Sequence, residues 1–272
     1  MSKTSGKNIV LDIDATLVHT HSDVENFDCL NIFKKSHRVR LRKKLYTMKL
    51  YDVSVEDGTG DEIILSGVYR PYLKEFLDFC LEYFDNVIIW SAGRKKYVEK
   101  MCDLMFPVIG KRPRVIYNYD DCDVGREDYL KKPLRKLYKD QRLIDININE
   151  KNTFVLDDRD DTFSLNSSNG IQIPEFESDM TPEEINFHPD VCLVKLMCWL
   201  SKKEVKNSTD VRKLDKDRIF TTSLKEYSRS VRTQKQILQT EKPISPKRKT
   251  KPISPKRKTK SSTRRQKEKR KE

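Results

Sequence analysis

A short apolar run that ends in two carboxylates constrains this chain more than any other feature. Residues 9–11 (Ile-Val-Leu) are typical of a buried strand in a parallel sheet, and Asp12 and Asp14 follow at once. Alternate residues of a strand point to one face, and open α/β sheets bind ligands beyond the carboxyl ends of their strands. We therefore expect Asp12 and Asp14 to lie side by side at a sheet edge where such folds carry out chemistry.

Two such carboxylates suit phosphoryl transfer. Asp12 could attack a phosphorus atom and become an aspartyl phosphate, and Asp14 could protonate the leaving oxygen and later deprotonate a water. Because two carboxylates and a phosphate repel one another, this chemistry needs a divalent cation, and Mg²⁺ prefers oxygen ligands. An Asp-x-Asp pair also occurs at ordinary strand ends, so the pair alone does not decide between a catalytic and a structural role.

The same pattern returns later in the chain. Residues 152–156 form a second apolar run, and Asp157 and Asp158 follow it. Two such strand ends in one α/β domain can converge on a single cation. We expect the acidic loop over 120–123, in contrast, to be solvated and not to bind metal.

A third apolar strand, over 86–91, ends in a small hydroxyl residue, Ser91. A basic helix over 94–105 follows, and a hydroxyl beside the backbone N–H groups of a helix start forms an anion site. A plain helix cap is the alternative role for Ser91. A further strand is predicted over 114–117.

Between the first strand and the next core element, the sequence predicts an inserted β-meander over about 20–68. Its strands are expected over 38–50 and 62–69, with a hairpin turn at 56–61. The basic residues at 38–44 are predicted to form a solvated face, with a docking surface for an acidic substrate as the alternative.

Apolar spacing and start signals predict further helices. Pro71 is expected to open one helix at its first position, and a helix-like pattern runs over 134–138. An amphipathic helix over 190–202 is expected to cover the other face of the sheet, and residues 219–238 can hold one more helix.

The C-terminal segment cannot build a core. Residues 242–250 (Lys-Pro-Ile-Ser-Pro-Lys-Arg-Lys-Thr) recur unchanged as 251–259, and residues 242–272 hold 15 Lys or Arg against two Glu, which accounts for the whole net charge of +13. Such a segment is predicted to be disordered and to contact nucleic acid or acidic proteins, or only to aid solubility. The predicted organisation is a folded domain over 1–203, a linker over 204–241 and this tail.

Cysteine and histidine usage bears on the compartment. The six Cys form no Cys-x-x-Cys pair and the four His are not clustered, so we expect free thiols and no zinc site. No secretory leader and no apolar run of about 18 residues stand out. We expect a nuclear or cytoplasmic protein without membrane contact, in which the basic tail can act as a nuclear localisation signal.

Several stretches together resemble a known family. The motif Asp12-Ile-Asp-Ala-Thr16 resembles motif I of the haloacid dehalogenase superfamily, and the chain resembles more narrowly the RNA polymerase II C-terminal-domain phosphatases, the NLI-interacting-factor-like group. The later motifs of that group are resembled by residues 69–73, 88–93 (Ile-Ile-Trp-Ser-Ala-Gly), 132–134 (Lys-Pro-Leu) and 157–161 (Asp-Asp-Arg-Asp-Asp). The resemblance covers about residues 8–202. It implies an α/β, Rossmann-like haloacid dehalogenase fold, with a central, mostly parallel sheet flanked by helices.

The resemblance also implies roles for individual residues. Asp12 would be the nucleophile and Asp14 the general acid and base. The implied Mg²⁺ ligands are Asp12, the backbone carbonyl of Asp14, and Asp158, with Asp157 behind them. The implied phosphate-binding residues are Thr16, Ser91, Ala92 and Lys132, with Lys131 left open as the alternative to Lys132.

The implied function is that of a Mg²⁺-dependent phosphoserine and phosphothreonine protein phosphatase, acting on the RNA polymerase II C-terminal domain or a similar nuclear phosphoprotein. Two alternatives stay open. One is a polynucleotide 3′-phosphatase of the same superfamily, whose substrate the basic tail would grip. The other is a non-catalytic scaffold that binds phosphorylated partners, against which the presence of Asp12, Asp14, Asp157 and Asp158 argues.

Overall fold

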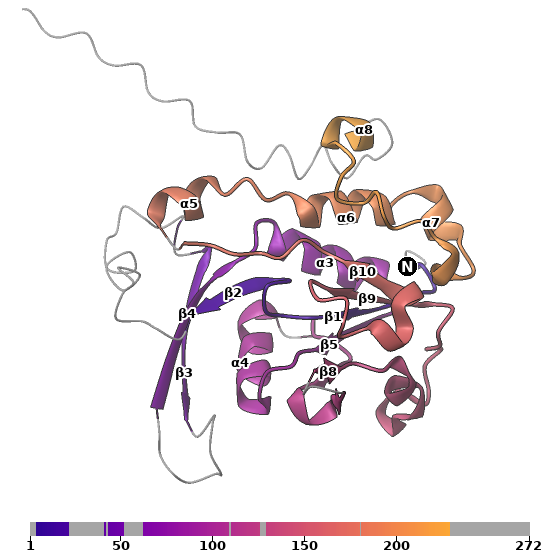
Figure 1. The fold of residues 1–272 in the computed structure, drawn as a ribbon, viewed down its shortest axis with the longest axis horizontal. Helices are drawn as coiled ribbons and strands as arrows, with labels where there is room; N and C mark the ends of the chain where they lie inside the picture. Colours follow the sequence, from indigo (N-terminus) through magenta and orange to yellow (C-terminus); the bar gives the residue numbers. More distant parts are fainter. Residues whose placement is uncertain are drawn as a thin grey trace, which may run out of the picture.

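A parallel five-stranded sheet, in the order β10-β9-β1-β5-β6, forms the centre of the molecule (Figure 1). The computed structural model describes residues 4–21, 41, 43–51, 62–108, 110–125, 129–179 and 181–228. The predicted hairpin turn at 56–61, most of the basic residues at 38–44 and the tail over 242–272 lie outside the described residues.

The strands of this sheet are short and buried. Their bounds are β1 (Asn8–Leu11), β5 (Asn86–Trp90), β6 (Val115–Tyr117), β9 (Thr153–Asp157) and β10 (Gly170–Gln172). All four pairings between neighbours are parallel, which confirms the predicted α/β class and the strands read from apolar runs. The sequence did not predict β10, because a three-residue Gly-Ile-Gln strand is too short to show a pattern.

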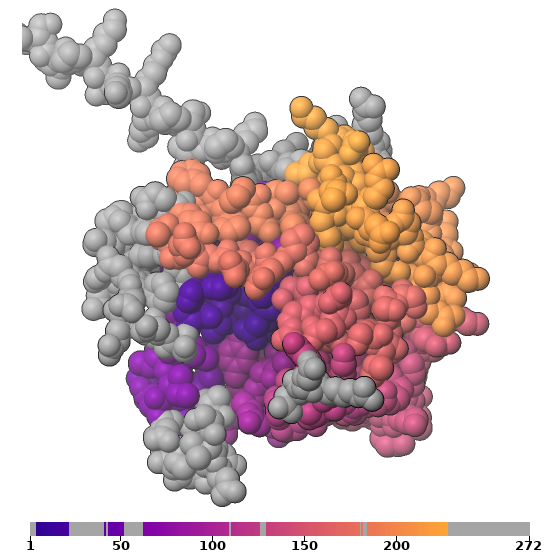
Figure 2. All heavy atoms as spheres, viewed as in Figure 1, coloured from indigo at the N-terminus to yellow at the C-terminus, as the bar shows by residue number. Residues whose placement is uncertain are grey.

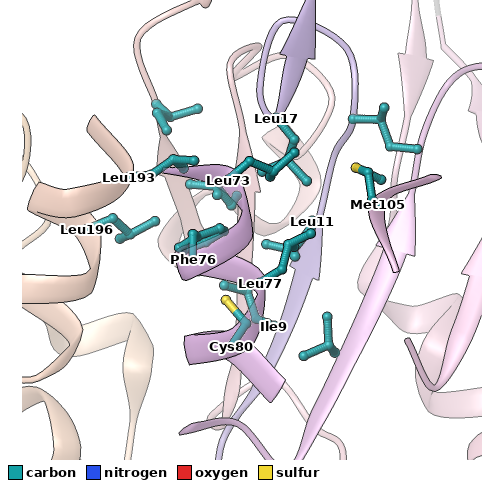
Figure 3. Packing of buried hydrophobic residues seen from close by; sticks show 14 of the residues in the cluster. Ile9, Leu11, Leu17, Leu73, Phe76, Leu77, Cys80, Met105, Leu193 and Leu196 are labelled. Carbon is teal, nitrogen blue, oxygen red and sulfur yellow. The ribbon is translucent and has the colours of Figure 1, made fainter. Parts of the chain in front are cut away.

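Side chains of β1 alternate between two hydrophobic layers. Ile9 and Leu11 pack in one layer with the helices α3 (Leu73–Tyr83), α4 (Lys95–Met105) and α6 (Cys192–Leu200), as Figure 3 shows in part. Val10 packs in the other layer, against the short 3₁₀-helices η4 (Leu134–Lys139) and η5 (Gln141–Leu143). The period of two predicted from the sequence therefore sets the two faces of the sheet.

The helix predicted over 190–202 forms as α6, but the face predicted for it is wrong. Leu193 and Leu196 lie beside Phe76 of α3 in Figure 3, in the same layer as α3 and α4. The sequence pattern shows that a helix has an apolar side but not which face of the sheet that side covers. The opposite face is instead covered by η4 and η5, so the helix-like pattern over 134–138 becomes a 3₁₀-helix.

The inserted segment forms a separate antiparallel sheet of three strands, in the order β2-β4-β3. The strands are β2 (Val18–His21), β3 (Leu45–Tyr51) and β4 (Glu62–Tyr69). The strand predicted over 38–50 begins only at Leu45, because Lys44 lies in a turn and donates its N–H to Leu41 O at 2.9 Å. The sequence did not predict β2, since Val-His-Thr-His carries too few apolar residues.

The predicted start of α3 at Pro71 is wrong. Tyr72 has a left-handed backbone, with φ 67°, which cannot continue a right-handed helix, and α3 begins at Leu73. Leu73 N–H bonds to Arg70 O at 3.1 Å, so Pro71 lies in a turn that precedes the helix.

The packed part of the chain extends beyond the predicted boundary at residue 203. Two short helices follow it, α7 (Lys203–Asn207) and α8 (Leu224–Ser228), with a 3₁₀-turn between them. The side chains that join the main core from this segment are Val205, Val211, Ile219 and Tyr227. The segment predicted as a linker therefore belongs to the folded domain at least to Ser228, and α8 lies within the range 219–238 where one helix was expected.

The remaining expectations about chemistry and membranes can be checked on the described residues. The five cysteines among them are free thiols, as predicted, and Cys29 lies outside them. In the acidic loop, Asp123 pairs with Lys136 at 2.8 Å and with Arg135, and Asp121 accepts the N–H of Asn118 at 2.9 Å. Within the described ranges, every helix is too short or too polar to span a lipid bilayer.

A buried arginine ties three loops together. The Arg70 side chain donates to Thr16 O at 2.9 Å, to Pro174 O at 2.7 Å, and to Asp190 Oδ2 at 2.8 Å. Asp190 in turn accepts the N–H of Cys192 at the start of α6 at 2.9 Å. The Arg70 side chain is fully buried, and its charge is matched by a carboxylate that is 10% exposed. This residue therefore holds the loop after β1, the loop after β10 and α6 in register.

Replacing Arg70 by Ala is expected to lower the free energy of unfolding by about 3–5 kcal/mol, because it leaves the largely buried Asp190 carboxylate without its cation and removes the donor to the carbonyls of Thr16 and Pro174. Urea unfolding followed by circular dichroism measures this. Lys74→Ala is the matched control: its ion pair with Asp78 is at the surface, with the lysine side chain 83% exposed, and we expect a change below about 0.5 kcal/mol. Equal effects of the two substitutions would contradict the role of Arg70 in holding the three segments together.

Ending the chain after Ser228 is expected to leave the thermal midpoint of unfolding unchanged. Ending it after Lys203 removes four buried apolar side chains, each worth about 1.5–3 kcal/mol, which together are comparable to the whole stability of a typical domain, about 5–15 kcal/mol. We expect the shorter chain not to unfold cooperatively, as measured by calorimetry. If a chain of residues 1–203 unfolds with the same thermal midpoint as the full chain, the folded domain ends at residue 203, as the sequence predicted.

Candidate active site

Two strand ends that lie far apart in the sequence meet at one edge of the sheet. Leu11 of β1 pairs with Leu156 of β9, so Asp12 and Asp157 follow side by side. Asp12 N–H continues the ladder to Leu156 O at 3.0 Å. Asp12, Asp157 and Asp158 each offer a carboxylate oxygen, and these oxygens lie within 4.8 Å of one another. The predicted convergence of the two acidic strand ends is thus present in the structure.

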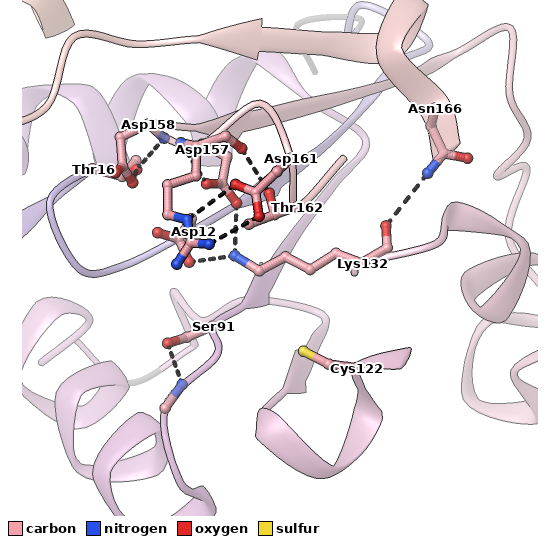
Figure 4. Close-up of polar contacts among 12 residues, drawn as sticks. Asp12, Thr16, Ser91, Cys122, Lys132, Asp157, Asp158, Asp161, Thr162 and Asn166 are labelled. Atoms are coloured by element: carbon pink, nitrogen blue, oxygen red, sulfur yellow. Dashed lines mark hydrogen bonds and ion pairs between the residues drawn. The ribbon is translucent and has the colours of Figure 1, made fainter. Parts of the chain in front are cut away.

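A lysine lies between two of these carboxylates. Lys132 Nζ is 2.5 Å from Asp12 Oδ1 and 2.6 Å from Asp157 Oδ2, contacts that Figure 4 shows as dashed lines. Lys131 Nζ instead donates to Asp161 O at 3.1 Å and to Ser164 Oγ at 2.9 Å. Of the two lysines left open by the sequence, Lys132 is the one at the acidic cluster.

Burial and close charges shift the pKa values of the side chains in this cluster. Burial alone would lower the pKa of Lys132, but the carboxylates of Asp12 and Asp157 outweigh it and raise that pKa above its ordinary value. Burial raises the pKa of Asp12 well above its usual range; Lys132 opposes this shift and Asp157 adds to it. Burial, followed by the charge of Asp157, also raises the pKa of Asp158. One ammonium thus faces three carboxylates.

A divalent cation fits this donor set. Carboxylate oxygens are the ligands that hard cations such as Mg²⁺ prefer, and a cation would offset the excess negative charge that Lys132 alone leaves. Among the described residues, these three carboxylates are the one group of acidic, His or Cys side chains that lie close enough together to hold a metal ion. The acidic loop over 120–123 is not part of it.

Thr16 connects the two acidic strand ends. Its side chain is fully buried and donates to Asp158 Oδ1 at 3.0 Å, and it accepts the N–H of Asp158 at 3.0 Å. This reciprocal pair fixes Asp158 against the loop that follows β1. Because the hydroxyl is already used in both directions, its implied part in binding phosphate stays a prediction.

Ser91 and Ala92 follow β5, the other neighbour of β1. The Ser91 side chain is buried, and its Oγ accepts the N–H of Gly93 at 3.0 Å. The residue that caps α4 is Arg94, so the plain helix-cap role for Ser91 is not what the structure shows. Figure 4 shows Ser91 on the same side of the sheet edge as Asp12 and Lys132. Binding of phosphate by Ser91 and Ala92 stays a prediction.

Asp14 lies beside the acidic cluster and not in it. Strand β1 ends at Leu11, so the alternation argument that paired Asp12 with Asp14 does not hold. The chain turns instead at Ala15, which has a left-handed backbone with φ 57°. The turn is closed by two N–H groups, those of Leu17 and Val18, which bond to Ile13 O at 2.8 and 3.1 Å.

The partners of the Asp14 side chain were not predicted. Its Oδ1 accepts hydrogen bonds from Thr20 Oγ1 at 2.9 Å and from the Tyr97 hydroxyl. Burial raises the pKa of Asp14, although both hydrogen bonds oppose that shift. Thr20 lies on the unpredicted strand β2 and Tyr97 on α4, so no local sequence signal could have linked them to Asp14.

Comparison with known proteins places this geometry in context. Residues 7–212 match the family model of NLI interacting factor-like phosphatases. The ubiquitin-like domain-containing CTD phosphatase 1 of Xenopus laevis is 27% identical over 222 residues, covering 75% of this chain and 64% of the relative. The Drosophila melanogaster protein of the same name is 29% identical over 164 residues, 56% of this chain and 45% of the relative. The chain thus spans less than two thirds of the length of these relatives.

A solved structure shares the fold. The structure of Fcp1, described as an essential RNA polymerase II CTD phosphatase, matches with a TM-score of 0.50 at 16% sequence identity. The match covers 82% of this chain and 63% of that chain. At this identity the similarity shows the architecture, which agrees with the α/β fold described above.

Adding Mg²⁺ is expected to raise the thermal midpoint of unfolding by several degrees, because a ligand that binds only the folded state stabilises it. Asp158→Asn is expected to remove most of this shift, since it takes away one of the three clustered carboxylates. Asp161→Asn is the matched control, because Asp161 pairs with Arg159 at the surface. An equal Mg²⁺ shift in all three proteins would show that the ion does not bind at the cluster.

Proposed function

The chain belongs to the NLI interacting factor-like phosphatase family, and from this membership and the geometry of the site we propose that it is a Mg²⁺-dependent phosphoserine and phosphothreonine protein phosphatase. One observation carries the proposal: Asp12, Asp157 and Asp158 meet around a buried lysine at the ends of two adjacent strands. Such an arrangement places a nucleophile, a charge-balancing ammonium and oxygen donors at one point.

In the proposed first step, a carboxylate oxygen of Asp12 attacks phosphorus. The Asp12 O–P bond forms while the bond from phosphorus to the serine or threonine oxygen breaks, and Asp14 gives its proton to that oxygen. The raised pKa of Asp14, caused first by burial, supports a carboxyl that carries a proton before this step.

In the second step, a water attacks the aspartyl phosphate. Asp14 takes a proton from the water as its oxygen bonds to phosphorus, and the bond between phosphorus and Asp12 breaks, releasing phosphate. Asp14 thereby regains the proton it gave, and both carboxyl groups return to their starting states.

Positive charge and backbone donors would hold the phosphate. The position of Lys132 between Asp12 and Asp157 supports its role beside the phosphoryl oxygens, and Ser91 and Ala92 lie on the adjacent loop. Asp12, the backbone carbonyl of Asp14, and Asp158 would hold Mg²⁺. When bound there, the ion would offset the repulsion between the phosphate and the carboxylates.

The substrate proposal rests on the relatives. Two of them carry the name CTD phosphatase, so we propose the RNA polymerase II C-terminal domain, or a similar nuclear phosphoprotein, as the substrate. The basic segment 242–272 is proposed to contact nucleic acid or acidic proteins and to direct a nuclear location, with a cytoplasmic one as the alternative.

Three substrates offered to the purified full chain with Mg²⁺ test this function. They are an aryl phosphate, a phosphoserine peptide of the polymerase heptad sequence, and a 3′-phosphorylated oligonucleotide. Release of phosphate from the peptide and the aryl phosphate is the expected result. Turnover of the oligonucleotide in place of the peptide would support a polynucleotide 3′-phosphatase, and peptide binding without any turnover would support a scaffold.

Replacing Asp12 by Asn is expected to lower phosphate release by at least about 10³-fold, because the amide cannot act as the nucleophile. The thermal midpoint should remain close to that of the parent protein or rise, since the substitution removes one of three crowded carboxylates. Asp161→Asn serves as the surface control and should keep full activity. Activity retained by Asp12→Asn would exclude the aspartyl phosphate route.

A further inference from the structure

Three hydroxyl groups from three different elements form a cluster beside Asp14, and two of them bond to one of its carboxylate oxygens. Thr20 Oγ1 donates to Asp14 Oδ1 at 2.9 Å, and the Tyr97 hydroxyl donates to the same oxygen. Thr20 Oγ1 is also 2.8 Å from the Tyr97 hydroxyl and 2.6 Å from the Tyr46 hydroxyl. The hydroxyls belong to β2, α4 and β3, so this cluster forms only once the inserted sheet has packed against the core.

The register of the inserted sheet builds this cluster around a glycine. Gly67 of the central strand β4 pairs with Thr20 on one side and with Tyr46 on the other. With no side chain on Gly67, the Tyr46 ring can cross β4 and reach Thr20. A Cβ at this position would lie 2.2 Å from the Tyr46 hydroxyl oxygen and 2.3 Å from His19 O. The glycine is therefore required by the close approach of the tyrosine.

Each hydroxyl has one hydrogen to donate, and this fixes which groups donate and which accept within the cluster. Tyr46 can donate to Thr20, and both Thr20 and Tyr97 donate to Asp14 Oδ1. Among the described residues, no hydrogen bond reaches Asp14 Oδ2. An oxygen that already accepts two hydrogen bonds is the poorer place for the acid proton, so a protonated Asp14 carries its proton on Oδ2.

The hydroxyls keep their hydrogens over the working range of pH. Burial raises the pKa of Tyr97 far above its usual value, and the charge of Asp14 adds to this shift. Burial likewise raises the pKa of Tyr46, against a smaller opposing effect of its hydrogen bond with Thr20. Both phenols therefore remain neutral donors beside the carboxyl group.

We propose that Thr20, Tyr46 and Tyr97 are positioning residues that fix the orientation of the Asp14 carboxyl group through the hydrogen bonds to its Oδ1, which leave Oδ2 to face the leaving group. The inference rests on the proposed function, and it gives the inserted sheet a part in the proton transfer itself. These hydroxyls do not touch the substrate; they act through Asp14, which lies between them and the bond that breaks.

The leaving group provides the test, because an alkyl oxygen such as that of serine needs a proton to depart and a p-nitrophenolate does not. We expect Tyr97→Phe to lower kcat/KM for a phosphoserine peptide by about 10–100-fold, and for p-nitrophenyl phosphate by less than about threefold. Thr20→Val should likewise lower kcat/KM for the peptide much more than for p-nitrophenyl phosphate. Thr20→Ser, which keeps the hydroxyl, should have kcat/KM values close to those of the parent protein.

A double-mutant cycle shows whether the effect passes through Asp14. In an Asp14→Asn background, adding Tyr97→Phe should cause no further loss on the peptide. Tyr83→Phe is the matched control, because the Tyr83 hydroxyl donates to Leu200 O at 2.7 Å, away from the site. It should leave both substrates unaffected, and unfolding curves of all variants identify any loss of fold.

The outcomes separate this inference from the proposed function. If the parent protein turns over neither substrate, the proposed function fails. If it turns over both and Tyr97→Phe lowers the two rates equally, or raises the rate on the peptide, only the positioning role is overturned. If adding Tyr97→Phe to the Asp14→Asn background lowers kcat/KM on the peptide by the same factor as it does in the parent protein, the positioning role is likewise overturned, because Tyr97 would then act independently of Asp14.

Discussion

The buried contact of Lys132 with Asp12 and Asp157 is the interaction on which the site depends. Burying charged groups costs several kcal/mol per ion, and an ion pair recovers that cost only with good geometry. Here the geometry is good, with Nζ 2.5 and 2.6 Å from the two carboxylate oxygens, but Asp158 leaves the cluster with more negative than positive charge. Such a cluster is a poor way to stabilise a fold, and it is well suited to bind a cation and a phosphate.

Another buried cation, Arg70, shows the contrast. Arg70 meets one carboxylate, that of Asp190, and two backbone carbonyls, so its charge and its donors are satisfied within the protein. It holds the loop after β1 in place through Thr16, whose side chain in turn fixes Asp158. The chain thus uses a balanced buried cation to position loops and an unbalanced one at the proposed active site.

Strands that end in carboxylates could be predicted from the sequence, because a run such as 9–11 or 153–156 shows burial and polarity in consecutive residues. The meeting of these two strand ends in one acidic cluster could also be predicted, because open α/β sheets bind ligands beyond the carboxyl ends of their strands. The face covered by α6 could not be predicted, since it depends on contacts between distant segments. Lys132 was favoured over Lys131 only through the resemblance to a family motif, and its contacts with Asp12 and Asp157 agree with that choice. The left-handed Tyr72 likewise has no signal in the residues around it.

The two acidic residues that the sequence pairs are held by different parts of the structure. Asp12 is fixed by the core, through the ladder to β9 and through Lys132. Asp14, beyond the end of β1, is held by the inserted sheet through Thr20, and by α4. The turn at Ala15 separates them, so the junction of the two sheets runs between the proposed nucleophile and the proposed proton donor. Under the proposed mechanism, substitutions at the contacts of Asp12 should therefore alter attack on phosphorus, whereas those at Thr20 or Tyr97, which hold Asp14, should alter departure of the leaving group.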